Sequence, residues 1–159
     1  MNFDATEFRR ALGRFASGVT VVTGTSPDGK LAGVTISAFS SLSLDPPLVL
    51  FCLGRDAQCR EAFAVGRDFA VHVLAEGQTE ISNTFASRAE DRFADVDYRT
   101  SDSGCPILQG CLAVLECRCE TVHDGGDHLL VIGAVQRIER PDVELRPLLH
   151  FRGEYSRLA

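Results

Sequence analysis

The sequence lacks the features of several large classes of protein. Its 159 residues include 16 lysines and arginines against 22 aspartates and glutamates, a formal net charge of −6. Nucleic acids and anionic membranes are bound by concentrated positive charge, so this balance argues against either as a partner. No stretch approaches the ~20 apolar residues that a membrane-spanning helix needs. With 45% hydrophobic residues and neither linker nor repeat, the sequence predicts one domain over residues 1–159.

The motifs of several common sites are absent as well. The sequence has no G-x-G-x-x-G after a strand and no P-loop, so neither a Rossmann nor a P-loop nucleotide site is expected. It also has no G-x-S-x-G nucleophile elbow and no C-x-x-C pair. Cys117 and Cys119 share one face of a predicted strand, but no second pair completes a tetrahedral zinc site, and we predict no metal. Residues 1–4 have neither the basic nor the apolar region of a secretion signal, so we expect a cytoplasmic protein with reduced thiols.

The spacing of apolar residues predicts mainly β structure with short helices. A first helix is indicated by the apolar residues that recur at helical spacing from Phe8 to Phe15, and Gly18 would end it. Turn residues at 26–29 and 124–127 predict two hairpins. Strands without regular alternation with helices favour an antiparallel barrel or sandwich. The predicted strands cover 19–23, 31–36, 48–53, 69–74, 112–122, 129–138 and 148–151, and the two further helices cover 58–65 and 78–86.

The most unusual segment, residues 33–47, mixes hydroxyl side chains with small and apolar ones. Four of its hydroxyl residues, from Thr35 to Ser43 inclusive, occupy odd-numbered positions. An uninterrupted strand would therefore direct all four side chains to one face. Such a strip suits a flat heterocycle that needs hydrogen bonds along its edge, together with a phosphate tail. An edge strand with a solvated hydroxyl face explains the same pattern, and composition alone favours that simpler interpretation.

Two histidines receive opposite interpretations. His72 lies within an apolar strand and is predicted to be a core or interface residue. His128 follows Gly125-Gly126-Asp127 at the mouth of a predicted hairpin, where a side chain can reach a ligand, although a surface histidine without a role is the alternative. No nucleophile–base pair or pair of carboxylates stands out, which is consistent with a cofactor that carries the chemistry.

Several motifs occur together in one order along the chain. One is the stretch from Thr35, which ends in Ser-Leu-Ser-Leu-Asp-Pro-Pro-Leu-Val at residues 41–49. Further motifs occupy 8–23, 69–78, 85–93, 126–128 and 147–155. In these motifs the sequence resembles the short-chain flavin reductases, the reductase components of two-component flavin-dependent monooxygenases.

The resemblance implies a fold and an activity. The fold is an antiparallel split β-barrel, the FMN-binding split barrel, in a homodimer whose flavin sites lie near the subunit boundary. The activity is that of an NAD(P)H:flavin oxidoreductase, which reduces FMN or FAD by hydride transfer and supplies reduced flavin to a separate monooxygenase. A non-catalytic carrier or sensor that binds flavin or haem is the alternative. The choices between FMN and FAD, and between NADH and NADPH, stay open.

The resemblance also assigns residues. His128 would contact the nicotinamide as the catalytic residue, and Tyr155 would pack near the flavin ring. Arg88 and Arg92 are candidates for phosphate or dinucleotide charge. The predicted cofactor-binding residues are Thr35, Ile36, Ser37, Ala38, Ser40, Ser41, Arg55, Gln58, Phe85, Arg88, Arg92 and Tyr155.

Two segments depart from the family pattern. At 56–58 this chain has Asp-Ala-Gln where family members usually carry Ser or Thr, which shifts the expected phosphate contacts toward Arg55. His150 and Phe151 stand where tyrosine is frequent in the family.

Overall fold

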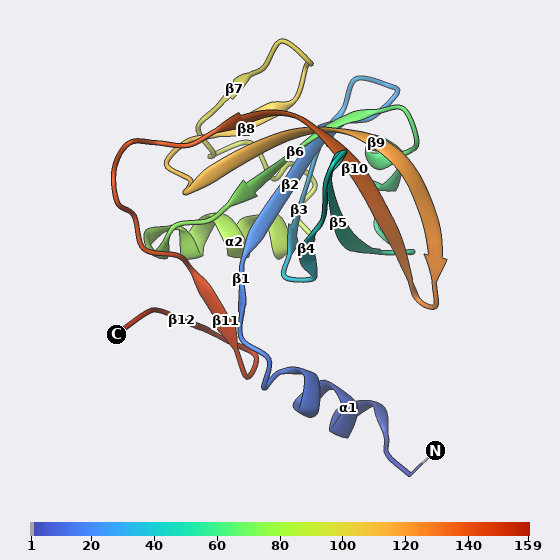
Figure 1. Ribbon diagram of the computed structural model, residues 1–159, viewed down its shortest axis with the longest axis vertical. Helices are drawn as coiled ribbons and strands as arrows, with labels where there is room; N and C mark the ends of the chain where they lie inside the picture. Colours follow the sequence, from blue (N-terminus) through green and yellow to red (C-terminus); the bar gives the residue numbers. More distant parts are fainter. Residues whose placement is uncertain (1) are drawn as a thin grey trace.

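One antiparallel sheet of seven strands forms the body of the molecule (Figure 1). The computed structural model describes residues 2–159. The strand order in the sheet is β3-β2-β6-β9-β10-β5-β4, with β3 and β4 at its two ends, and the prediction of mainly β structure is confirmed. The strands are β2 (Thr20–Thr25), β3 (Leu31–Ile36), β4 (Phe39–Leu44), β5 (Pro47–Gly54), β6 (Asp68–Val73), β9 (Ala113–Gly125) and β10 (His128–Glu139).

Both predicted hairpins are confirmed. The β2–β3 pair runs in register from Thr20 opposite Ile36 to Thr25 opposite Leu31. The β9–β10 pair closes at Gly126-Asp127, where Gly126 has a φ of 74°, a left-handed conformation that favours glycine. The turn residues therefore fixed these two connections locally.

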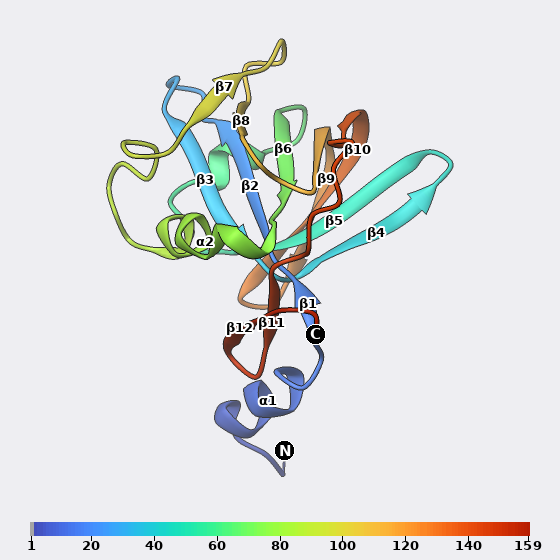
Figure 2. The same ribbon diagram turned by 90° about the vertical axis from the view of Figure 1, so that its left-hand side faces the viewer.

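Shorter elements surround the sheet. The helix α2 lies across β2 and β3, and β7 pairs with β8 (Figure 2). Within residues 2–159, none of the helices has the length and apolar character to span a membrane. The remaining elements are α1 (Ala5–Leu12), β1 (Ser17–Gly18), η1 (Arg60–Phe63), η2 (Glu76–Gln78), α2 (Thr79–Ala86), β7 (Tyr98–Thr100), β8 (Pro106–Leu108), β11 (Leu149–Phe151) and β12 (Glu154–Ser156).

Three local predictions are wrong in their extent or kind. The first helix ends at Leu12 with Gly13 as its C-cap, and Gly18 belongs to the short strand β1. The helix predicted over 58–65 is a single 3₁₀ turn. Between residues 86 and 112, where the sequence predicted neither strand nor helix, the structure has the β7–β8 pair, in which Thr100 pairs with Pro106 around a turn at Gly104.

Two buried clusters hold the sheet together. In the first, Phe51, Phe63 and Phe69 meet edge to face with ring centroids 5.4–6.2 Å apart. The second lies against α2 and includes Phe85 and Leu108. Each buried aromatic side chain removes about 150–250 Å² from water, so these rings supply much of the apolar burial.

His72 is a core residue, as predicted. It is fully buried on β6, with Nδ1 3.0 Å from the carbonyl oxygen of Val21 and Nε2 accepting the N–H of Leu108 at 3.1 Å. Burial lowers the pKa of His72 to about 4. The ring is therefore neutral at pH 7, and it joins β6 to β2 and β8.

The two ends of the chain form a small terminal unit beside the sheet (Figures 1 and 2). β1 pairs with β11, β11 pairs with β12, and the N–H of Arg152 donates to the carbonyl of Gly13 at 2.8 Å. None of the residues of α1 is buried, and Phe15, just after the helix, is 83% exposed. The β4–β5 hairpin extends from the sheet on another side and exposes 94% of Leu44 (Figure 2).

Candidate functional site

The segment with many hydroxyl residues is not one continuous strand. β3 ends at Ile36, the chain bends at Ser37 and Ala38, and β4 has a register irregularity between Ser41 and Ser43. The shared parity of the four hydroxyl residues therefore has no structural basis, because a period of two holds only along an uninterrupted strand. β4 is an edge strand, as the simpler interpretation requires, and Ser40 and Ser41 are exposed on it.

Sheet register places His128 near this segment. The N–H of Cys52 on β5 donates to the carbonyl of Ala38 at 3.0 Å. Cys52 pairs with Leu130 on β10, and Gly54, two positions along β5, pairs with His128. The beginning of β4 and the tip of the β9–β10 hairpin thus lie at the same end of β5. The structure brings the predicted flavin strip and the predicted nicotinamide contact to one region.

His128 is held at the hairpin tip by its neighbour in sequence. Its Nδ1 lies 2.7 Å from Oδ1 of Asp127, and the pair is exposed to solvent. The bond to His128 lowers the pKa of Asp127. A carboxylate at Nδ1 favours the tautomer with its proton on that nitrogen, which leaves Nε2 as an acceptor toward a ligand.

Arg55 is engaged with the same hairpin. Its Nε donates to the carbonyl of Gly126 and its Nη2 to Oδ1 of Asp124, both at 2.6 Å. The N–H of Arg55 also donates to the carbonyl of Asp127 at 3.0 Å. These bonds fix the tip that carries His128 and occupy donors of the guanidinium that the sequence analysis assigned to phosphate.

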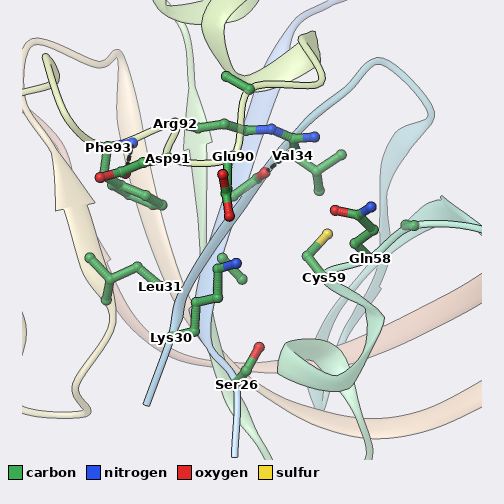
Figure 3. Close-up of a pocket in the computed structure, with 14 residues that line it drawn as sticks. Ser26, Lys30, Leu31, Val34, Gln58, Cys59, Glu90, Asp91, Arg92 and Phe93 are labelled. Carbon is green, nitrogen blue, oxygen red and sulfur yellow. Dashed lines mark hydrogen bonds between the residues drawn. The ribbon is translucent and has the colours of Figure 1, made fainter. Parts of the chain in front are cut away.

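A cavity of about 570 Å³ runs along β3 (Figure 3). Gln58 and Cys59 line one side and Glu90, Asp91 and Arg92 line the other, so two of the predicted cofactor residues, Gln58 and Arg92, meet here. Lys30 adds a second positive charge toward one end, and the cavity reaches Val34, the residue before Thr35. Its lining combines apolar strand residues with two cations and two carboxylates.

Arg92 is the best placed of the predicted arginines. Its Nη1 donates to the carbonyl of Gly33 at 2.7 Å and to that of Phe85 at 3.2 Å. Both bonds use Nη1, so the other donors of the guanidinium are available to an anion in the cavity. Arg88, in contrast, is exposed and is not part of the cavity lining.

Two predicted contacts are buried. Phe85 is fully buried and packs edge to face on Phe93 with ring centroids 5.0 Å apart. Ile36 belongs to the first core cluster, and its carbonyl accepts the hydroxyl of Thr20 at 2.7 Å. Gly33 is required beside Phe85, because a Cβ there would overlap the phenylalanine ring.

Thr35 and Tyr155 are connected through α2. The hydroxyl of Thr35 donates to the carbonyl of Ser82 at 2.6 Å, and the phenol of Tyr155 lies 2.7 Å from the hydroxyl of Ser82. The sequence analysis missed Ser82, as it missed Lys30 and Glu90 of the cavity. The sequence did not indicate a role for this serine inside a short predicted helix, because its hydrogen-bond partners are distant in sequence.

The donor set fits a phosphate-bearing nucleotide with a polar planar ring. Arg92 and Gln58 offer hydrogen-bond donors within the cavity, and the exposed hydroxyls of Ser40 and Ser41 lie on an edge strand. The thiols of Cys117 and Cys119 are less suited to a ligand, because burial raises their pKa values to about 12 and about 11 and keeps them protonated.

Comparison with known proteins identifies the family. A family model described as a flavin reductase like domain matches residues 12–159. The reductase subunit HsaB of a flavin-dependent monooxygenase from Mycobacterium tuberculosis is 44% identical over 154 residues, which cover 96% of this chain and 82% of that protein. FMN reductase (NADH) SmoA from Agrobacterium fabrum is 41% identical over 152 residues, covering 96% of this chain and 85% of that one.

A solved structure agrees in fold over nearly the whole chain. It is the NADH:FAD oxidoreductase SgcE6 of Streptomyces globisporus, in complex with NAD and FAD fragments. The TM-score is 0.91 at 37% sequence identity, over 98% of this chain and 93% of that one. The split-barrel prediction is confirmed by this likeness. The chain belongs to the family of flavin reductase like domains.

Proposed function

We propose that this chain is an NAD(P)H-dependent flavin reductase that reduces FMN or FAD and supplies reduced flavin to a separate monooxygenase. The observation that carries the proposal is the pairing that places Ala38, just before the exposed hydroxyls of β4, and His128 at the same end of β5. Two similar proteins, SmoA and SgcE6, have NADH in their names, which favours NADH as the donor.

The chain's own residues bind and orient rather than transfer protons. The hydroxyls of Ser40 and Ser41 and the outer backbone groups of the edge strand β4 would hydrogen-bond the polar edge of the ring. Bound flavin supplies the hydride acceptor. His128, held by Asp127, would contact the nicotinamide and keep it against the ring. Correct orientation of two reactants can lower a barrier by about 7–11 kcal/mol, so no general acid or base is needed.

Arg92 and Gln58 are proposed as the phosphate contacts. Both line the cavity that reaches Val34, and Arg92 is fixed by two carbonyls. Arg55 would act indirectly, since its bonds to Gly126 and Asp124 hold the hairpin tip. Arg88 would contribute charge from the surface.

We also propose a homodimer. Apolar residues of α1, Phe15 just after it and Leu44 at the end of β4 are exposed on the single chain, Phe15 at 83% and Leu44 at 94%. Exposed apolar surface of this kind marks interaction sites, and a second copy of the chain would cover it. A cytoplasmic location is consistent with the six free cysteines.

Anaerobic reduction of added flavin by NADH tests the function. The wild-type chain is expected to oxidise NADH in step with bleaching of FMN or FAD, and the same reaction with NADPH and riboflavin gives its preferences. A protein that binds flavin but leaves both absorbances unchanged would be the carrier or sensor instead. Light scattering during size-exclusion chromatography measures the mass, and a monomer at micromolar concentration would contradict the dimer.

A further inference from the structure

Ser82 is the point at which three elements of the fold meet. It lies in the middle of α2 and is fully buried. Its carbonyl accepts the hydroxyl of Thr35 on β3 at 2.6 Å, and its own hydroxyl lies 2.7 Å from the phenol of Tyr155 on β12. One residue of α2 therefore contacts two predicted cofactor residues that lie far apart in the sequence.

The donors in this network follow from proton counting. The phenol of Tyr155 donates to Oδ1 of Asn83 at 3.0 Å, and a phenol has one proton, so the hydroxyl of Ser82 must donate to Tyr155. The single hydroxyl proton of Thr35 is likewise committed to the carbonyl of Ser82. Thr35 consequently presents only lone pairs to a ligand.

We propose that Ser82 is a positioning residue of the flavin site. It fixes the hydroxyl of Thr35 as a hydrogen-bond acceptor for the ring N–H of a flavin, and it fixes Tyr155 at the edge of the same site. The inference rests on the proposed function and deepens it, because it assigns Thr35 to the ring edge and excludes it as a donor to phosphate.

The same network joins the terminal unit to the sheet. Tyr155 belongs to the β11–β12 hairpin, which pairs with β1 and through it connects to α1. The bonds from Tyr155 to Ser82 and Asn83 attach this hairpin to α2. Arg92 donates to the carbonyl of Phe85, so a second residue of α2 also faces the proposed site through its backbone. α2 thus acts as the support on which ligand contacts from separate segments are aligned.

Ser82→Ala tests the proposal with a matched control on the same helix. The variant removes the hydroxyl bond to Tyr155 and keeps the carbonyl that holds Thr35. We expect the KM for flavin to rise about two- to tenfold, the effect of one lost hydrogen bond, with the KM for NADH unchanged. The control is Thr84→Ala, which also removes a hydroxyl from α2, but one that bonds only to the carbonyl of Glu80. It should leave both KM values and the rate at wild-type level.

A double-mutant cycle separates positioning from packing. Tyr155→Phe removes the same bond, together with the phenol's bond to Asn83, from a partly exposed residue, so it is expected to fold. If Ser82 acts through Tyr155, the double variant will have the flavin KM of Tyr155→Phe alone. Independent, multiplicative effects would overturn the proposal. Thr35→Val should raise the flavin KM, and Thr35→Ser, which keeps the hydroxyl, should restore it.

The outcomes distinguish this inference from the function on which it rests. A wild-type chain that fails to reduce flavin overturns the proposed function itself. A wild-type chain that reduces flavin, with Ser82→Ala indistinguishable from Thr84→Ala, overturns the role of Ser82 alone. If Ser82→Ala does not fold, Tyr155→Phe decides, and an unchanged flavin KM in that variant refutes the positioning role.

Discussion

Lowering the pH from 7 to 5 is expected to destabilise the fold through His72. In the folded chain the ring donates to Val21, accepts from Leu108 and has a pKa of about 4, against an ordinary value near 6.5 when unfolded. Between these values the unfolded state binds the extra proton, so stability rises with pH and is lost as the pH falls. With these two pKa values, the free energy of unfolding drops by about 2 kcal/mol between pH 7 and pH 5.

Urea unfolding at a series of pH values measures this loss, with His72→Gln as the control. Glutamine does not titrate and keeps an amide that can accept from Leu108 and donate to Val21. Its absolute stability is expected to be lower, but its change between pH 7 and pH 5 should be smaller than that of the wild type by about the same 2 kcal/mol. Equal changes in the two proteins would refute the reasoning. So would an NMR titration that placed the midpoint of the folded His72 ring near 6.5.

Three further predictions concern the site and the core. His128→Ala should raise the KM for NADH with flavin affinity largely retained, in steady-state assays and flavin titrations; a loss of flavin affinity with unchanged NADH kinetics would assign this histidine to the other ligand. Ser41→Ala should weaken flavin binding by about 0.5–1.5 kcal/mol in a fluorescence titration, and an unchanged dissociation constant would remove Ser41 from the site. Gly133→Ala would place a Cβ into the ring of Phe69 and 3.2 Å from the Cβ of Cys117, so urea unfolding should show a loss of about 1–3 kcal/mol. Wild-type stability in that variant would contradict the tight packing.

The parts of the fold that local chemistry decides were predictable. Asp124-Gly125-Gly126-Asp127 marks a tight turn between two apolar strands, and β9 and β10 meet there. His72 stands among apolar residues of one strand, and its burial followed from that context. Both features depend on residues a few positions apart, whose conformations are set by turn preference and by the burial of neighbouring side chains.

The hydroxyl segment shows where a local pattern misleads. Counting parity from Thr35 to Ser43 assumes an extended chain, but the chain bends at Ser37 and β4 is irregular after Ser41. The bend allows the chain to leave one end of the sheet and return at the other, since β3 and β4 are its two end strands. Such a change of direction depends on how the whole sheet is arranged, which residue types alone do not express.

Arg55 and Arg92 show, within the site, the same difference between what residue type predicts and what the fold determines. Their sequence contexts made both candidates for phosphate, yet contacts across the fold separate them. Arg55 is bonded to the β9–β10 tip, whereas Arg92 lies along the cavity beside β3. Charge can be read from residue type, but a guanidinium's available donors depend on which carbonyls and carboxylates surround it.

The sequence by itself determined the β-rich class, the principal hairpins, the core position of His72 and the family to which the motifs point. The first three follow from composition, periodicity and turn chemistry, which act over short distances along the chain, and the family follows from the resemblance of its motifs. Only the tertiary structure decided that His128 lies near Ala38, that Arg92 lines a cavity and that Ser82 joins Thr35 to Tyr155. These arrangements involve residues remote in sequence, and only the register of the sheet and the docking of α2 bring them together.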